Sequence, residues 1–240
     1  GNLVADEALD ISNSMIKAML PINTAALAPQ VDIRRLTPGE NIQSILHIDH
    51  NDSAVLLYLQ AQDQSLNSKA STALLSEILS APFYTQLRTE QQLGYIVFAT
   101  PMSLRQMPGI ALVVQSPKAS PDIIQQRMND FLEQFKQQIT DITDEQIIRF
   151  KNSLNARINE QDRQLQDRSN RLWQEIDLDE TEFNTQKKLT EMINQLNRND
   201  LIAAFSALLT RQMLLKSDGS GKEVTQAQTA QNPNKQNTNE

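Results

Sequence analysis

The sequence predicts an α+β protein, a two-layer sandwich of helices packed on an antiparallel or mixed sheet. Short apolar runs bounded by turn residues are interspersed with helical patterns, and the second half carries a long helical stretch. No repeat with the period of a solenoid or a propeller occurs in the sequence. We expect one domain over residues 1–218 and a tail over residues 219–240.

The chain begins with a helix and a pair of strands. Apolar residues at helical spacing start at Ala8, and Pro21 ends that helix. The apolar runs 42–48 and 54–59 lie on either side of the turn-like segment 50–53. The two runs therefore predict a β-hairpin.

A second helix and a second strand pair follow. Apolar positions from Leu66 to Ile78 predict a helix that continues toward Arg88. Residues 95–102 and 110–114 are separated by a turn containing Pro-Gly, so they predict two further strands.

The helices of the second half carry recognisable starting signals. Ser120 followed by Pro121 supplies a cap and a preset first helical residue. Thr143 with Gln146 fits a capping box. These signals predict two consecutive helices.

The end of the predicted domain contains two more helices and a strand. Asp179 with Glu182 repeats the capping pattern ahead of an apolar stretch that ends at Leu196. A short helix after Asn199 leads to residues 212–215, which predict a closing strand. The tail 219–240 is rich in Gln, Asn and Thr with almost nothing to bury, so we expect it to be disordered.

Composition excludes several classes of function. A net charge of -7 opposes binding to phosphate backbones, and no basic cluster with interleaved aromatics occurs, so no nucleic acid partner is expected. No apolar run approaches the roughly 20 residues of a spanning helix, so no membrane association is expected. The absence of cysteine excludes disulfides and thiolate metal sites.

The sequence also lacks the usual catalytic motifs. His47 and His50 are the two histidines, and on a strand an offset of three places them on opposite faces, which is poor geometry for a shared metal. No His-Glu-x-x-His or His-x-x-Glu-His zinc pattern occurs, and Gly219 to Lys222 lacks the first glycine and the Ser or Thr of a phosphate loop. We therefore expect no catalytic residue, metal or cofactor in this chain alone.

The most informative stretch is residues 80–98, where the chain passes from a helix end through a polar bend into an apolar strand. Arg88 offers a planar fork of donors, and Tyr95 offers a hydroxyl that can bond a carbonyl or an oxyanion. Composition alone favours plain structural roles, because arginine suits a helix C-terminus and tyrosine at a strand end is usually packing. The remaining positions of interest in this stretch are Leu87, Gln92, Leu93 and Gly94.

This stretch closely resembles the Leu-Arg-Thr-x-x-Gln-Leu-Gly-Tyr-x-Val motif of the pitrilysin and insulin-degrading enzyme family of zinc metallopeptidases, a group of clamshell enzymes. A weaker resemblance extends over residues 1–216. It implies the two-layer fold of the pitrilysin and processing-peptidase domains. It also implies a non-catalytic C-terminal domain that binds extended peptide and completes an active site whose zinc lies in an N-terminal half of the same polypeptide.

By the same resemblance, the residue at Arg88 contacts the substrate backbone, and the residue at Tyr95 stabilises the scissile carbonyl. The partners implied are a peptide substrate and the N-terminal catalytic half. Two alternatives remain open, namely a processing-peptidase-like assembly subunit and a self-standing peptide-binding domain. The resemblance places the parent enzyme in the bacterial periplasm, with the cytoplasm as the alternative.

Overall fold

The computed structural model describes residues 3–19 and 33–218, and it divides into two compact units after Arg34. The first unit contains helix α1, Ala5–Met19, which agrees with the predicted helix. All its residues are exposed, including Leu9 and Met15. The predicted stop at Pro21 and the predicted disordered tail both lie outside the described residues.

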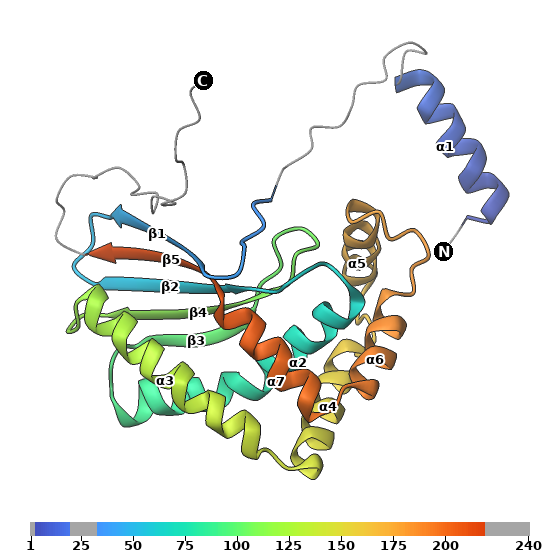
Figure 1. Cartoon of the computed structure of the whole chain (residues 1–240). Coiled ribbons are helices and arrows are strands. Elements are labelled where there is room, and N and C mark those ends of the chain that lie inside the picture. Colours follow the sequence, from blue (N-terminus) through green and yellow to red (C-terminus); the bar gives the residue numbers. More distant parts are fainter. Residues whose placement is uncertain (1–2, 20–32, 219–240) are drawn as a thin grey trace, which may run out of the picture. The chain divides into compact units, whose positions relative to one another are not determined.

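The second unit is built on a five-stranded mixed sheet with the order β1-β5-β2-β4-β3 (Figure 1). Strand β1 runs parallel to β5, whereas the other neighbouring pairs are antiparallel. The predicted α+β class with a mixed sheet is thus confirmed. The strands are β1 Glu40–His47, β2 Ser53–Gln60, β3 Ile96–Pro101, β4 Gly109–Ser116 and β5 Arg211–Asp218.

The predicted hairpin of the first two strands is wrong, although both strands exist. The closing strand β5 lies between them and pairs with each, as in Ile42 with Met213 and Tyr58 with Met213. The segment between β1 and β2 lacks an Asn-Gly or Asp-Gly pair, the sequence signal of a tight two-residue hairpin turn. A strand from the other end of the chain therefore separates β1 from β2. The second predicted pair is correct, because β3 and β4 are antiparallel neighbours.

The helices follow the predicted order, and two of their caps form as expected. Ser120 accepts a hydrogen bond from the Ile123 amide, and Thr143 with Gln146 makes a complete capping box. The elements are α2 Leu66–Tyr84, the π-helical turn η1 Thr85–Glu90, α3 Pro121–Asp141, α4 Asp144–Ile158, α5 Leu165–Asp177, α6 Thr185–Gln195 and α7 Arg198–Leu209.

The region around residue 180 differs from the prediction. Asp179 and Phe183 adopt left-handed backbone angles, with φ of 59° and 51°, so the proposed cap is part of a turn. Helix α6 begins only after Asn184. The preceding α5 was not predicted as a separate helix, because it leaves Trp173 61% exposed while it buries Glu175.

The core lies between one face of the sheet and helices α2, α3 and α7 (Figure 1). A chain of aromatic contacts joins these helices, from Phe83 through Phe131 and Phe135 to Phe205, with centroid separations of 5.1 to 5.8 Å. Strand side chains alternate between this core and the opposite face of the sheet. No helix among the described residues is long and apolar enough to cross a membrane.

Candidate functional site

Helix α2 does not end with a regular turn but continues into the π-helical turn that holds Arg88. The Gln91 amide donates to the Gln86 carbonyl at 3.0 Å, and Gln92 then adopts a left-handed angle of φ 49°. The Leu93 amide closes the turn by donating to the Leu87 carbonyl at 2.9 Å. Single π turns inside helices are frequent at functional sites.

The two leucines of the motif anchor this turn in the core. Leu87 is fully buried, and Leu93 retains 9% of its exposure. Both belong to the main apolar cluster under the sheet. The sequence motif therefore combines buried anchors with exposed positions between them.

Gly94 allows the chain to pass unusually close to the end of β4. A Cβ atom at this position would lie 2.0 Å from the carbonyl oxygen of Gln115, well inside van der Waals contact. Gly94 is itself buried, so the segment cannot simply move into solvent. This close approach brings Tyr95 beside Gln115.

The Tyr95 side chain is 49% exposed, and two neighbours from other elements hold its hydroxyl. The hydroxyl donates to Asp52 Oδ2 at 2.6 Å and accepts from Gln115 Nε2 at 2.6 Å. Gln115 Nε2 also donates to Asp52 Oδ2 at 3.1 Å. Asp52 comes from the loop between β1 and β2, and Gln115 from β4, so the three groups close a triangle at one end of the sheet.

These contacts set the acidity of both groups. The hydrogen bond to Asp52 raises the pKa of Tyr95, because a phenolate beside a carboxylate is disfavoured. The hydrogen bond from Tyr95 lowers the pKa of Asp52, and Gln115 and the nearby His50 act in the same direction. The ground state is therefore a neutral phenol beside an ionised carboxylate.

Arg88 lies in the last turn of η1 and is half-buried. Its guanidinium makes no hydrogen bond or ion pair with any other described residue. By contrast, Arg171 is fixed by two-point contact with Asp162. Arg88 and Tyr95 come from the same motif, yet no hydrogen bond joins them within the described part of the chain. The fork of Arg88 is thus available to an external acceptor.

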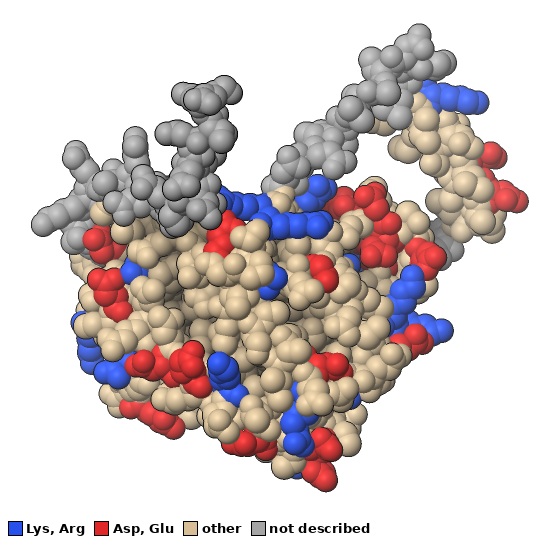
Figure 2. All heavy atoms as spheres, in the orientation of Figure 1, with Lys and Arg blue, Asp and Glu red and all other residues tan. Residues whose placement is uncertain are grey.

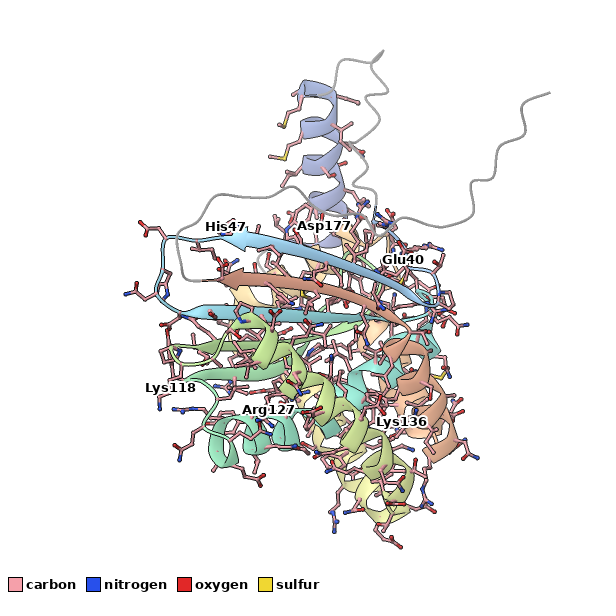
Figure 3. The ribbon with its side chains drawn as sticks, turned by 60° about the vertical axis from the view of Figure 1, so that its left-hand side comes forward. Glu40, His47, Lys118, Arg127, Lys136 and Asp177 are labelled. Carbon is pink, nitrogen blue, oxygen red and sulfur yellow. The ribbon has the colours of Figure 1, made fainter. Side chains whose placement is uncertain are left out.

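The histidines do not form a shared site. His47 Nδ1 lies 3.0 Å from Asp218 Oδ1, and Figure 3 shows His47 at the end of β1 opposite to Glu40. His50 Nδ1 instead accepts from the Asp52 amide at 3.0 Å. Within residues 3–19 and 33–218, no group of three or more His, Cys, Asp or Glu side chains is arranged to hold a metal ion.

Two hollows elsewhere on the second unit contain neither Arg88 nor Tyr95. One, of about 210 Å³, lies at the start of α2 and is lined by polar groups such as Asp63 and Ser68. The other, of about 380 Å³, lies between α2, α3 and α4 and is mainly apolar. On the face shown in Figure 2, acidic and basic side chains are intermixed rather than gathered into one basic surface. The candidate site is therefore an open surface at the end of the sheet.

Comparison with known proteins gives this geometry a context. Residues 74–173 match the family model described as PQQ synthase PqqF-like, C-terminal lobe domain 4. The chain is 26% identical to the insulin-degrading enzyme of Drosophila melanogaster over 218 residues and 27% identical to a nardilysin-like protein of Arabidopsis thaliana over 245 residues. The chain is homologous to the C-terminal region of the M16 peptidases.

The M16 likeness extends over nearly the whole chain but over a small part of each relative. The two alignments cover 88% and 96% of this chain, and 22% and 24% of the relatives. The crystal structure of pitrilysin superposes with a TM-score of 0.77 at 22% identity, covering 97% of this chain and 25% of that one. The chain thus spans about a quarter of the length of its M16 relatives and has the fold of a pitrilysin domain.

Sequence reasoning singled out Arg88 and Tyr95 but not Asp52 and Gln115, the two side chains that bond the Tyr95 hydroxyl. Gln115 pairs with Ile96 across β3 and β4, so the register of the second strand pair could have identified it. Asp52 had no local signal, because its position depends on where the loop between β1 and β2 lies in the folded sheet.

Proposed function

We propose that this chain is the non-catalytic C-terminal domain of a zinc-dependent oligopeptidase. In this proposal it binds extended peptide and completes an active site whose zinc lies in an N-terminal half of the same polypeptide. The Tyr95 hydroxyl stabilises the carbonyl oxygen of the scissile bond, and Arg88 holds the substrate backbone.

The observation that carries the proposal is the Tyr95 side chain, which is half-exposed and yet has its hydroxyl fixed by two other side chains. A hydroxyl whose position is set before the reaction suits stabilisation of a developing oxyanion, once the substrate replaces Asp52 as the acceptor of its proton. The close packing at Gly94 supports this reading, since it presses the Tyr95 segment against β4.

The Arg88 side chain supports the role proposed for it, which is to hold the substrate backbone. A planar guanidinium offers two parallel donors to a peptide carbonyl, and this one has no acceptor among the described residues. Similarity to the insulin-degrading enzyme and to pitrilysin supports peptide as the substrate class, because these relatives are peptidases. A catalytic metal would have to come from outside the described residues, which hold no suitable group of ligands.

The test is steady-state kinetics on the full-length protein that contains this chain. Tyr95→Phe removes one hydroxyl and should lower kcat by about 10² to 10³, as when a single oxyanion donor is deleted. Arg88→Lys keeps the charge but loses the fork, so we expect both a higher KM and a lower kcat.

Each variant has a matched control in the chain. Tyr84 is also 49% exposed, so Tyr84→Phe removes the hydroxyl of an equally exposed tyrosine outside the triangle. Arg127 is an exposed arginine on α3, marked in Figure 3, so Arg127→Lys controls for the exchange itself. Normal turnover in Tyr95→Phe and Arg88→Lys, with lowered melting temperatures, would refute the proposal and favour an assembly subunit of the processing-peptidase kind.

A further inference from the structure

The hydroxyl of Tyr95 has a single proton to donate, and Asp52 already accepts it. The donor and acceptor are 2.6 Å apart, a short distance that suits a hydrogen bond to an ionised acceptor. The hydroxyl oxygen accepts from Gln115 at the same time. In this state the phenol cannot donate to anything else.

Asp52 is a stronger acceptor than a peptide carbonyl would be. Hydrogen bonds to ionised groups are roughly twice as strong as those between neutral groups. Gln115 Nε2 donates to the same Oδ2 atom, which stabilises the ionised form of Asp52. A peptide carbonyl that accepts the hydrogen bond from Tyr95 must therefore replace this carboxylate as the acceptor.

We propose that Asp52 is a positioning residue. Without peptide it accepts the hydrogen bond from the Tyr95 hydroxyl, which we call the resting contact. An incoming peptide carbonyl replaces Asp52 as the acceptor of that hydrogen bond. This inference rests on the proposed function, because it needs a peptide that reaches Tyr95. The carboxylate fixes the Tyr95 ring at the end of the sheet and keeps its hydroxyl protonated. It also lowers the affinity for peptide, because the hydroxyl must exchange one acceptor for another.

The first experiment measures peptide binding to this 240-residue chain. The probe is a dansyl-labelled decapeptide with blocked ends and no charged side chains, followed by fluorescence anisotropy. Asp52→Asn keeps the shape of the side chain but makes the acceptor neutral. We expect it to bind the probe about fivefold more tightly, the difference between a charged and a neutral acceptor.

Asp49 provides the matched control. It lies in the same loop, is exposed, and makes no hydrogen bond or ion pair with other described residues, so Asp49→Asn removes the same charge without touching Tyr95. Asp49→Asn should bind like the wild type. Equal affinity of Asp52→Asn and the wild type, or an equal gain in both Asn variants, would overturn the inference.

The second experiment detects the resting contact without any peptide. The chain contains three tyrosines, so ¹³Cζ labelling gives three resonances that Tyr→Phe variants assign. Asp52→Asn should shift the resonance of Tyr95 and leave those of Tyr58 and Tyr84 in place, and Asp49→Asn should shift none. An unmoved Tyr95 resonance in Asp52→Asn would overturn the resting contact.

The two experiments also separate the inference from the proposed function. In one outcome, the wild type and all variants fail to bind the probe while the Tyr95 resonance moves in Asp52→Asn. The proposed peptide binding is then refuted, and so is the competition between Asp52 and a peptide carbonyl. The hydrogen bond between Asp52 and Tyr95 is still supported. If Tyr95→Phe weakens binding and Asp52→Asn does not strengthen it, peptide binding stands and the inference alone is refuted.

Discussion

The carboxylate of Asp52 and the hydroxyl of Tyr95 lie 2.6 Å apart although 43 residues separate them in the chain. The contact depends on the fold, since it joins the loop between β1 and β2 to the segment that enters β3. It controls the charge of the residue on which the proposed function depends.

The acidity of Tyr95 should respond to its two partners in opposite directions. Asp52 raises the pKa of the phenol, whereas Gln115 lowers it. We therefore expect Asp52→Asn to lower the pKa of Tyr95 and Gln115→Leu to raise it. A ¹³Cζ titration between about pH 8 and about pH 12, around the ordinary tyrosine value, measures both shifts. The titration of Tyr84 in the same spectra is the internal control, and parallel shifts of both tyrosines would contradict the prediction.

Gly94 should tolerate no side chain. In Gly94→Ala the new methyl would meet the Gln115 carbonyl, a backbone atom that cannot rotate away, so we expect a loss of about 2 to 3 kcal/mol. Gly39→Ala offers a contrast, because Gly39 has φ of 84° but no atom of the described residues lies within 4 Å of an added Cβ. That variant should lose only about 1 kcal/mol through its left-handed backbone.

Chemical denaturation followed by circular dichroism measures both losses. The Tyr95 resonance supplies a second readout, which should move in Gly94→Ala and not in Gly39→Ala. Equal stability of the two variants would show that the segment can withdraw from β4 without cost.

Tyr58 should make the fold sensitive to alkali. Burial raises the pKa of Tyr58 to about 12, and the side chain is 1% exposed. Below pH 10 both the folded and the unfolded chain hold the proton, so the stability is unaffected. Between about pH 10 and about pH 12 the unfolded chain releases the proton first, which favours unfolding by up to roughly 2 kcal/mol. Denaturation curves across this range should show a steeper fall in the wild type than in Tyr58→Phe, and identical slopes would contradict the prediction.

The chain by itself should bind no stoichiometric zinc and cleave no peptide. Its described residues hold no group of three or more potential ligands, and an open catalytic zinc site needs three protein ligands. Metal analysis of chelator-washed protein and a fluorogenic peptide assay test this expectation. Cleavage by the pure chain that a chelator abolishes would refute it.

Local signals in the sequence predicted the elements well, and long-range pairing was where prediction failed. The caps at Ser120 and Thr143 form as expected, because a cap depends on residues within one turn. The first hairpin was wrong because the partner of β1 is β5, at the other end of the domain. The same limit explains the candidate site, where the motif identified Tyr95 but only the folded sheet identifies Asp52.

Helix α5 determines which optical methods can follow unfolding. The single tryptophan of the sequence is Trp173, and its indole already faces water in the folded chain. Its emission should therefore change little when the phenylalanine cluster between α2, α3 and α7 comes apart. A fluorescence melt would then give little signal for unfolding, and the midpoint of core unfolding has to be read from backbone ellipticity or calorimetry.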